Sequence, residues 1–275
     1  MSTRAFKTLN YAAGGIQLVL CAFLVTWFYT IDTESKTTSI DPDTGEIISG
    51  LAFPVGEYNQ PLGTGKDHGT VSVSTIVALL AVFTGITALV HVFVYARSSD
   101  WYQTSIERGS NWVRWVEYSI TATIMLFVIA VTCGVNSTDV LLLVCVATLC
   151  CMICGYMSET TATGTQKGVS IAATIMGWLL LISVFSVIIR RFSSIIGQTQ
   201  GTDSSPPDWV WITVVALTML FMVFGVIHLV HMWKQWTTGA SVSFNLRIEA
   251  SYTVASMVSK TLLVSLLASG LFLRT

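Results

Sequence analysis

The chain has 275 residues, of which 53% are hydrophobic and 11% charged, and its formal net charge at pH 7 is −1. Soluble domains usually carry about 25% charged residues, so this composition excludes an ordinary soluble protein. The near-neutral charge argues against a nucleic-acid partner. The apolar residues fall in long blocks between short polar stretches, which predicts several spans surrounded by membrane lipid.

Seven apolar blocks are long enough to cross a membrane, which takes about 20 residues in a helix. We therefore predict an all-α membrane protein, with residues 1–275 forming a single domain built as a seven-transmembrane-helix bundle. The first block continues without a small-residue cleavage site, so we interpret it as a span rather than a signal peptide. The predicted spans are 9–31, 71–96, 110–135, 139–157, 168–190, 208–233 and 245–273.

The connection over residues 32–70 is the only long one. It contains the turn sequence Asp41-Pro42-Asp43-Thr44-Gly45, whose Pro, Asp and Gly residues favour a chain reversal. Short apolar stretches at 47–48 and 51–55 follow the turn. We expect a small β-hairpin in this first extracellular loop.

The distribution of lysine and arginine predicts the orientation, because cytoplasmic loops are enriched in both. An N-terminus in the cytoplasm puts more of these residues on the cytoplasmic side than outside, and seven spans then place the C-terminus outside. The cytoplasmic set is Arg4, Lys7, Arg97, Arg108, Arg114, Lys167, Lys234 and Arg247, against Lys36, Lys66, Arg190, Arg191 and Arg274 on the extracellular side.

Two charged residues, Glu117 and Lys260, lie deep within apolar blocks. Charges at such depth are costly and indicate function. We expect the other charged residues to lie near span ends, where long side chains can reach the interface. Lys260 could belong to a structural ion pair, a transport site or a Schiff base, and Glu117 lies at a compatible depth to balance its charge. The residues alone leave these alternatives open.

Further polar residues gather toward the cytoplasmic ends of the spans, and we predict a polar network there. Each histidine among them could instead be an interfacial residue or a hydrogen-bonded core residue. The cysteines lie inside apolar blocks, which favours buried core residues and no metal site. The loops carry no catalytic motif, so we expect no enzyme. The predicted network contains Gln17, His91, His228, His231, Glu249 and Ser256.

Two segments resemble the heliorhodopsin family. Arg114-Trp115-Val116-Glu117-Tyr118-Ser119 is similar to the segment around the family's counterion glutamate, and Ser256-Met257-Val258-Ser259-Lys260 is similar to its retinal-binding segment. The resemblance extends over essentially the whole chain. It implies all-trans retinal attached to Lys260 through a Schiff base, with Glu117 as counterion and Ser256 nearby.

The resemblance also implies a homodimer, a retinal pocket that includes Tyr118 and a polar cavity that includes His91. Many relatives have histidine where this chain has Gln17, and a glutamine cannot titrate. A polyene requires an apolar, largely aromatic slot, although ordinary helix packing would equally explain the candidate side chains. The candidates for that slot are Met125, Trp178, Phe221 and Phe224.

We therefore predict a light-sensing photoreceptor in which photoisomerisation of retinal drives a conformational signal to an unidentified partner. The first alternative is a light-driven or light-gated proton or ion conductor. A second alternative is a chemosensory receptor or a transporter without retinal, which would need another explanation for Lys260.

Overall fold

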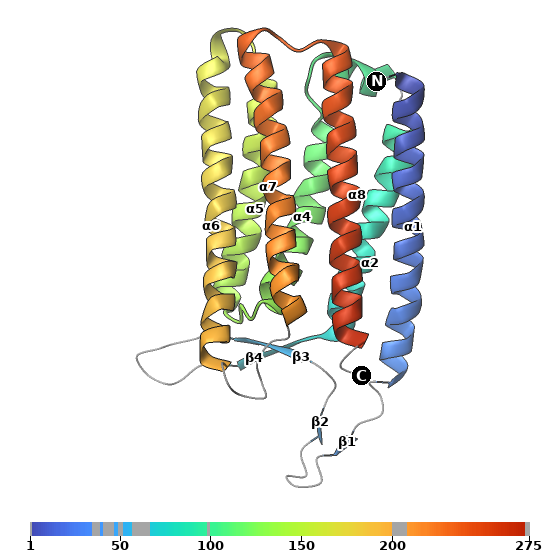
Figure 1. Ribbon diagram of the computed structural model, residues 1–275, viewed down its shortest axis with the longest axis vertical. Coiled ribbons are helices and arrows are strands. Elements are labelled where there is room, and N and C mark those ends of the chain that lie inside the picture. The colour runs from blue at the N-terminus through green and yellow to red at the C-terminus, as the bar shows by residue number, and fades with distance from the viewer. Residues whose placement is uncertain are drawn as a thin grey trace.

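Seven long helices run side by side in the computed structural model (Figure 1). Each is long and apolar enough to cross a membrane. The structure describes residues 2–34, 39–40, 47–48, 52–56, 67–97, 100–199 and 208–272. The seven helices are α1 (Thr3–Glu34), α2 (Val73–Val90), α4 (Trp112–Thr132), α5 (Thr138–Thr160), α6 (Lys167–Thr199), α7 (Asp208–Thr237) and α8 (Val242–Phe272).

Every predicted span overlaps one of these helices, but most of the helices extend past the apolar blocks. The helix α6, for example, continues to Thr199, whereas the predicted span ends at residue 190. An apolar block measures only the hydrocarbon crossing, whereas backbone hydrogen bonding continues into the interface. The short helix α3 (Asp100–Glu107), between α2 and α4, was not predicted. It buries Tyr102 and Ile106 against the bundle, and burial raises the pKa of Tyr102 well above its usual range.

The helix α2 continues into a π-helical turn, η1 (His91–Tyr95), in which the backbone N–H of Ala96 bonds to the carbonyl of His91 at 2.9 Å. Single π turns inside helices are frequent at functional positions. At its other end α2 is capped by Ser72, whose hydroxyl accepts a hydrogen bond from the Thr75 N–H at 3.1 Å.

Two antiparallel strand pairs precede α2. The strands β1 (Ser39–Ile40) and β2 (Ile47–Ile48) pair on either side of the predicted turn, although residues 41–45 themselves lie outside the described residues. The predicted apolar stretch at 51–55 becomes β3 (Ala52–Gly56), which pairs with β4 (Asp67–Ser72). The sequence did not predict β4, which leads directly into α2. Figure 1 places β3 and β4 at the end of the bundle opposite the N-terminus, called the strand end below.

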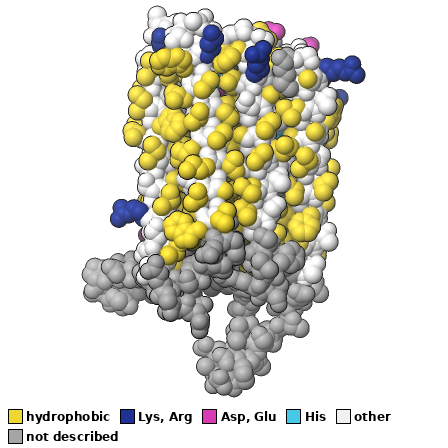
Figure 2. Space-filling view, in the orientation of Figure 1, with side chains coloured by type: hydrophobic (Ala, Val, Ile, Leu, Met, Phe, Trp, Pro, Cys, Tyr) yellow, Lys and Arg dark blue, Asp and Glu magenta, His cyan; other side chains and the backbone are white. Residues whose placement is uncertain are grey.

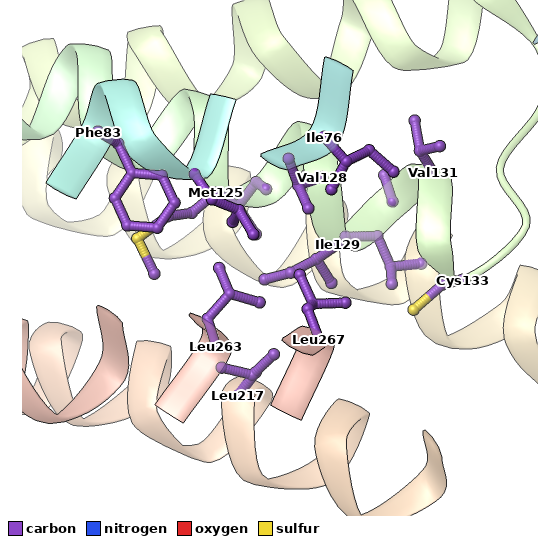
Figure 3. Close-up of a cluster of buried hydrophobic side chains, with 14 of the residues drawn as sticks. Ile76, Phe83, Met125, Val128, Ile129, Val131, Cys133, Leu217, Leu263 and Leu267 are labelled. Carbon is purple, nitrogen blue, oxygen red and sulfur yellow. The ribbon is translucent and has the colours of Figure 1, made fainter. Parts of the chain in front are cut away.

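Apolar side chains fill the bundle interior toward the strand end. Phe83 from α2, Met125 and Ile129 from α4, and Leu263 and Leu267 from α8 point toward one another (Figure 3). Because lipid is as apolar as these side chains, close packing rather than water exclusion favours their association. The outer surface is apolar too, and Figure 2 shows most visible Lys and Arg side chains near the N-terminal end.

Candidate functional site

Lys260 on α8 lies in the bundle interior beside Glu117 on α4, and both are about 2% exposed. The Lys260 Nζ donates to Glu117 Oε1 at 3.1 Å and to the Thr87 hydroxyl at 2.6 Å. Thr87, on α2, donates to the same Glu117 oxygen at 3.0 Å. Lys260, Glu117 and Thr87 therefore connect α8, α4 and α2. The lysine ammonium has two oxygen acceptors in this arrangement.

Two tyrosines complete the surroundings of this ion pair. The Tyr95 hydroxyl donates to Glu117 Oε2 at 3.2 Å, so each carboxylate oxygen receives a hydrogen bond from α2 or η1. The Lys260 Nζ lies 5.4 Å from the centre of the Tyr118 ring, within the range of a cation–π contact. Tyr95 belongs to the π turn η1, so this turn carries one of the groups that bond to the Glu117 carboxylate.

Lys260 stands at the wall of an internal cavity between α4, α5, α6, α7 and α8. This cavity holds about 790 Å³ of space that protein atoms do not fill, part of it open at the surface. Besides Lys260 and Tyr252, its lining includes all six of the predicted pocket residues, namely Tyr118, Met125, Trp178, Phe221, Phe224 and Ser256.

Glycines let two tryptophan rings form walls of this cavity. A Cβ atom on Gly225 would lie 2.8 Å from the Trp178 ring, and one on Gly155 would lie 2.2 Å from the Trp115 ring. Real Cβ contacts essentially never come this close. The glycines on α7 and α5 therefore leave room for these two rings against a neighbouring helix.

A second buried charge cluster lies nearer the N-terminal end of the bundle. Arg114 on α4 forms ion pairs with Glu159 on α5 and Glu249 on α8, and all three are at least nine-tenths buried. Asn111 donates to Glu249 at 2.8 Å, and the Trp115 indole donates to Glu159 at 2.8 Å. We call Arg114, Glu159 and Glu249, with these two donors, the Arg114 cluster.

The Arg114 cluster corrects the expectation that charged residues other than Glu117 and Lys260 reach the interface. Arg114, Glu159 and Glu249 are instead buried, and their opposite charges balance one another inside the bundle. We also predicted that Glu249 belongs to a polar network with the other polar residues near Lys260. Its carboxylate instead forms its hydrogen bonds with Arg114 and Asn111. It lies 11 residues from Lys260, or about 16 Å along a helix.

The remaining predicted network residues do not form one continuous group. His231 and His228 lie 3.6 and 4.0 Å from Glu159 and so belong beside the Arg114 cluster. His91 contacts Asn10 on α1 at 2.7 Å and stands one turn from Thr87. Gln17 is fully buried, but its amide makes no hydrogen bond within the described part of the chain.

Replacing Arg114 with methionine should lower the free energy of unfolding by about 3–5 kcal/mol, because it strands two buried carboxylates. The Arg4→Met variant, at an exposed position, should change it by no more than about 0.5 kcal/mol. Denaturant unfolding in detergent measures both. Adding Glu159→Gln and Glu249→Gln to Arg114→Met should restore much of the loss, and no restoration would contradict an ion-pair origin.

Sequence reasoning missed Thr87, Tyr95, Asn10 and Glu159. A usable signal existed for the first two, because Thr87, His91 and Tyr95 follow one another at four-residue spacing, which places them near one helix face. Glu159 offered no such signal. It ends an apolar block, where a carboxylate ordinarily faces water, and only the packing of α4 against α5 reveals its partner.

The site can therefore hold a covalently attached apolar ligand. A lysine amine can bond to an aldehyde, and a carboxylate 3.1 Å away can balance the resulting cation. The adjoining cavity presents mainly aromatic and aliphatic surface to the rest of such a ligand. Among the described residues, no group of three or more His, Cys, Asp or Glu side chains could hold a metal ion.

Comparison with known proteins supports a rhodopsin-type assignment. The crystal structure of Exiguobacterium sibiricum rhodopsin is similar at a TM-score of 0.57 and 12% identity, over 94% of each chain. The crystal structure of a thermophilic rhodopsin is similar at a TM-score of 0.58 and 10% sequence identity, over 96% of this chain and 95% of that chain. These likenesses show the fold alone, and no curated protein sequence matches. The family model for heliorhodopsin matches residues 8–272, so this chain belongs to the heliorhodopsin family and is a multi-pass membrane protein.

Proposed function

We propose that the protein is a light-sensing photoreceptor that carries all-trans retinal on Lys260, with Glu117 as counterion. Family membership implies a retinal chromophore. The observation that carries the proposal is the buried Lys260–Glu117 pair at the wall of an aromatic cavity. Bound retinal supplies the absorption of visible light and the isomerisation that follows.

The residues around Lys260 fit this cofactor. The amine lies on a cavity whose lining is almost entirely apolar, and its charge has one buried carboxylate partner. Trp178, Phe221 and Phe224 offer ring surface for a flat polyene, whereas Ser256 provides a hydroxyl one helical turn from Lys260. Lys260, Glu117 and Tyr118 would set the charge distribution at the attachment point.

Loss of the Lys260–Glu117 charge pair provides a route from light to a conformational signal. The pair and Thr87 join α2, α4 and α8, so moving its proton removes an attraction between three helices. Tyr252 lines the cavity and also stacks on Arg114, whose guanidinium lies 4.0 Å from the ring centre. A shift of this ring would therefore act on the Arg114 cluster and on the N-terminal end of the bundle.

The distribution of buried polar groups favours a sensor over a pump. The buried charged side chains among the described residues run from Lys260 toward the N-terminal end. Toward the strand end, the interior around Phe83, Ile129 and Leu263 is apolar (Figure 3). An efficient pump needs proton-carrying groups on both sides of its active lysine, and an apolar layer opposes proton passage.

We further propose that the N-terminus is cytoplasmic, following the excess of Lys and Arg at that end. The strand end and the C-terminus would then be extracellular. The expected assembly is a homodimer that passes its signal to a separate partner, with no catalytic activity of its own.

Light-induced current distinguishes a sensor from a conductor. Cells that express the protein with retinal should show a visible pigment but no sustained, direction-consistent photocurrent under voltage clamp. Sizeable currents would favour the light-driven or light-gated conductor instead. A purified protein that remains colourless with retinal would reject both functions.

A further inference from the structure

Three buried hydroxyl side chains join α5 to α6 near the N-terminal end of the bundle. Ser158 on α5 and Ser170 on α6 are fully buried, and Thr174 on α6 is 5% exposed. The Ser170 hydroxyl donates to the backbone carbonyl of Ser158 at 2.7 Å, and the Thr174 hydroxyl donates to the carbonyl of Ser170 at 3.0 Å. The Ser158 and Thr174 hydroxyl oxygens lie 2.6 Å apart. Because the one hydroxyl proton of Thr174 bonds to Ser170, Ser158 is the donor to Thr174.

The last turn of α7 is attached to these hydroxyl groups. The Trp236 indole N–H donates to the Ser170 hydroxyl at 2.8 Å. Ser170 can accept this bond because its own proton bonds to Ser158. The ammonium of Lys167, the first residue of α6, donates to the Trp236 carbonyl at 2.7 Å. We call Ser158, Ser170, Thr174 and Trp236 the Trp236 cluster.

Along the rest of their length, α6 and α7 meet through aromatic rings. The ring centres of Phe185 and Phe221 lie 5.3 Å apart, and those of Phe192 and Trp211 lie 5.0 Å apart. Apolar contacts are non-directional, whereas a hydrogen bond weakens steeply when its angle changes. A small displacement of α7 would therefore break the hydrogen bond of Trp236 while the rings remain packed.

Thr174 connects the Trp236 cluster to the internal cavity. Its side chain is part of the cavity lining, and so is Trp178, one turn farther along α6. The Trp178 ring lies against Gly225 of α7, where a Cβ atom would be only 2.8 Å away. A displacement of this wall would move the Thr174 hydroxyl, and Ser158 would then lose its acceptor.

The last turn of α5 takes part in two attachments of different strength. Glu159 joins α5 to α4 through its ion pair with Arg114, whereas Ser158, the preceding residue, joins α5 to α6 through neutral hydrogen bonds. Charge-assisted hydrogen bonds are roughly twice as strong as neutral ones. The Trp236 cluster is therefore the weaker of the two attachments at this end of the bundle.

We propose that the Trp236 cluster is a light-sensitive attachment that holds the last turn of α7 on α6 in the dark. Thr174 is its positioning residue, and it transmits a displacement of the cavity wall that releases Trp236. The released turn lies at the N-terminal end of the bundle (Figure 1), where a cytoplasmic partner would meet it. This inference rests on the proposed photoreceptor function for the release, but the attachment in the dark follows from the hydrogen bonds alone.

Hydrogen–deuterium exchange of the full-length protein in lipid nanodiscs tests the attachment in the dark. Mass spectrometry follows the backbone amides of residues 234–238. Trp236→Phe keeps an aromatic ring but removes the indole N–H, so exchange there should rise about five- to tenfold, the effect of losing one buried hydrogen bond on a local opening. Trp233→Phe makes the same change at an exposed position of α7 and should exchange like the wild type. Equal exchange in the wild type and Trp236→Phe would overturn the attachment.

Illumination tests the release separately. With retinal bound, light should raise the exchange of residues 234–238 in the wild type to about the level that Trp236→Phe shows in the dark. The same light should add little in Trp236→Phe, whose attachment is already lost. A pigment that responds to light while exchange in the wild type stays unchanged would contradict the release and leave Trp236 a purely structural role.

Thr174→Val tests the transmission from the cavity. Valine keeps the shape of the side chain but offers Ser158 no acceptor, so exchange at residues 234–238 should rise severalfold in the dark, and light should add little. Thr148→Val is the matched control, because the buried Thr148 hydroxyl bonds to the Val144 carbonyl of its own helix at 2.7 Å. It should behave like the wild type.

A full light response in Thr174→Val would show that Thr174 does not transmit the displacement. A wild-type protein that forms no pigment would reject the photoreceptor function and, with it, the release. The exchange measured in the dark without retinal would still decide whether the Trp236 cluster holds α7.

Discussion

The Lys260→Arg variant should fold normally, bind no retinal covalently and show no visible absorption band after retinal is supplied. Arginine keeps a positive charge beside Glu117, so the buried carboxylate retains a partner. Its guanidinium stays protonated and does not attack an aldehyde, unlike a buried lysine amine. Absorption spectroscopy of the purified protein with retinal measures the loss, which should be complete.

The Lys260→Ala variant should be equally colourless but less stable, since it leaves Glu117 without its cation. Lys234→Ala, at the end of α7, serves as the control and should form pigment like the wild type. Pigment from the wild type should bleach with hydroxylamine, which attacks an aldehyde-derived linkage. A visible band retained by both Lys260 variants would reject Lys260 as the attachment position.

The buried Lys260–Glu117 pair could be predicted from the sequence because its signal is local. A charged residue inside an uninterrupted apolar block has no route to water, whatever the neighbouring helices do. Lys260 and Glu117 are of this kind, and the structure places their side-chain atoms 3.1 Å apart. The seven helices were predictable for the same reason, since span length depends on the membrane and not on tertiary contacts.

The Arg114 cluster could not be predicted because its signal is not local. Arg114, Glu159 and Glu249 each lie near a helix end, where a charge ordinarily reaches the interface. They are buried because α4, α5 and α8 bring their charges together. The strand β4 was missed for a similar reason, since Asp67–Ser72 acquires its strand character by pairing with β3.

The two buried charge clusters divide the polar interior into parts with different expected roles. Lys260 lines the cavity, whereas Arg114, Glu159 and Glu249 do not and reach it only through the Trp115 and Tyr252 rings that contact them. Neutralising a carboxylate in each cluster should therefore affect different properties. Glu249→Gln should mainly lower stability, since it removes a partner of Arg114, and should leave the absorption maximum nearly unchanged.

The Glu117→Gln variant should instead move the absorption maximum to longer wavelength. At 3.1 Å and an effective dielectric constant of about 20, the ion pair is worth roughly 5 kcal/mol, about a tenth of the energy of a visible photon. Light moves positive charge away from the lysine nitrogen, so a neutral residue at 117 destabilises the ground state more than the excited state. The expected shift is therefore on the order of tens of nanometres.

The matched control is Glu249→Gln, which removes the negative charge of a different buried carboxylate. The wild type and Glu249→Gln should absorb at nearly the same wavelength, and only Glu117→Gln should absorb at a longer one. Absorption spectra of the three purified pigments, recorded at one pH, make the comparison. An unchanged maximum in Glu117→Gln, or an equal shift in Glu249→Gln, would show that the negative charge beside Lys260 does not come specifically from Glu117.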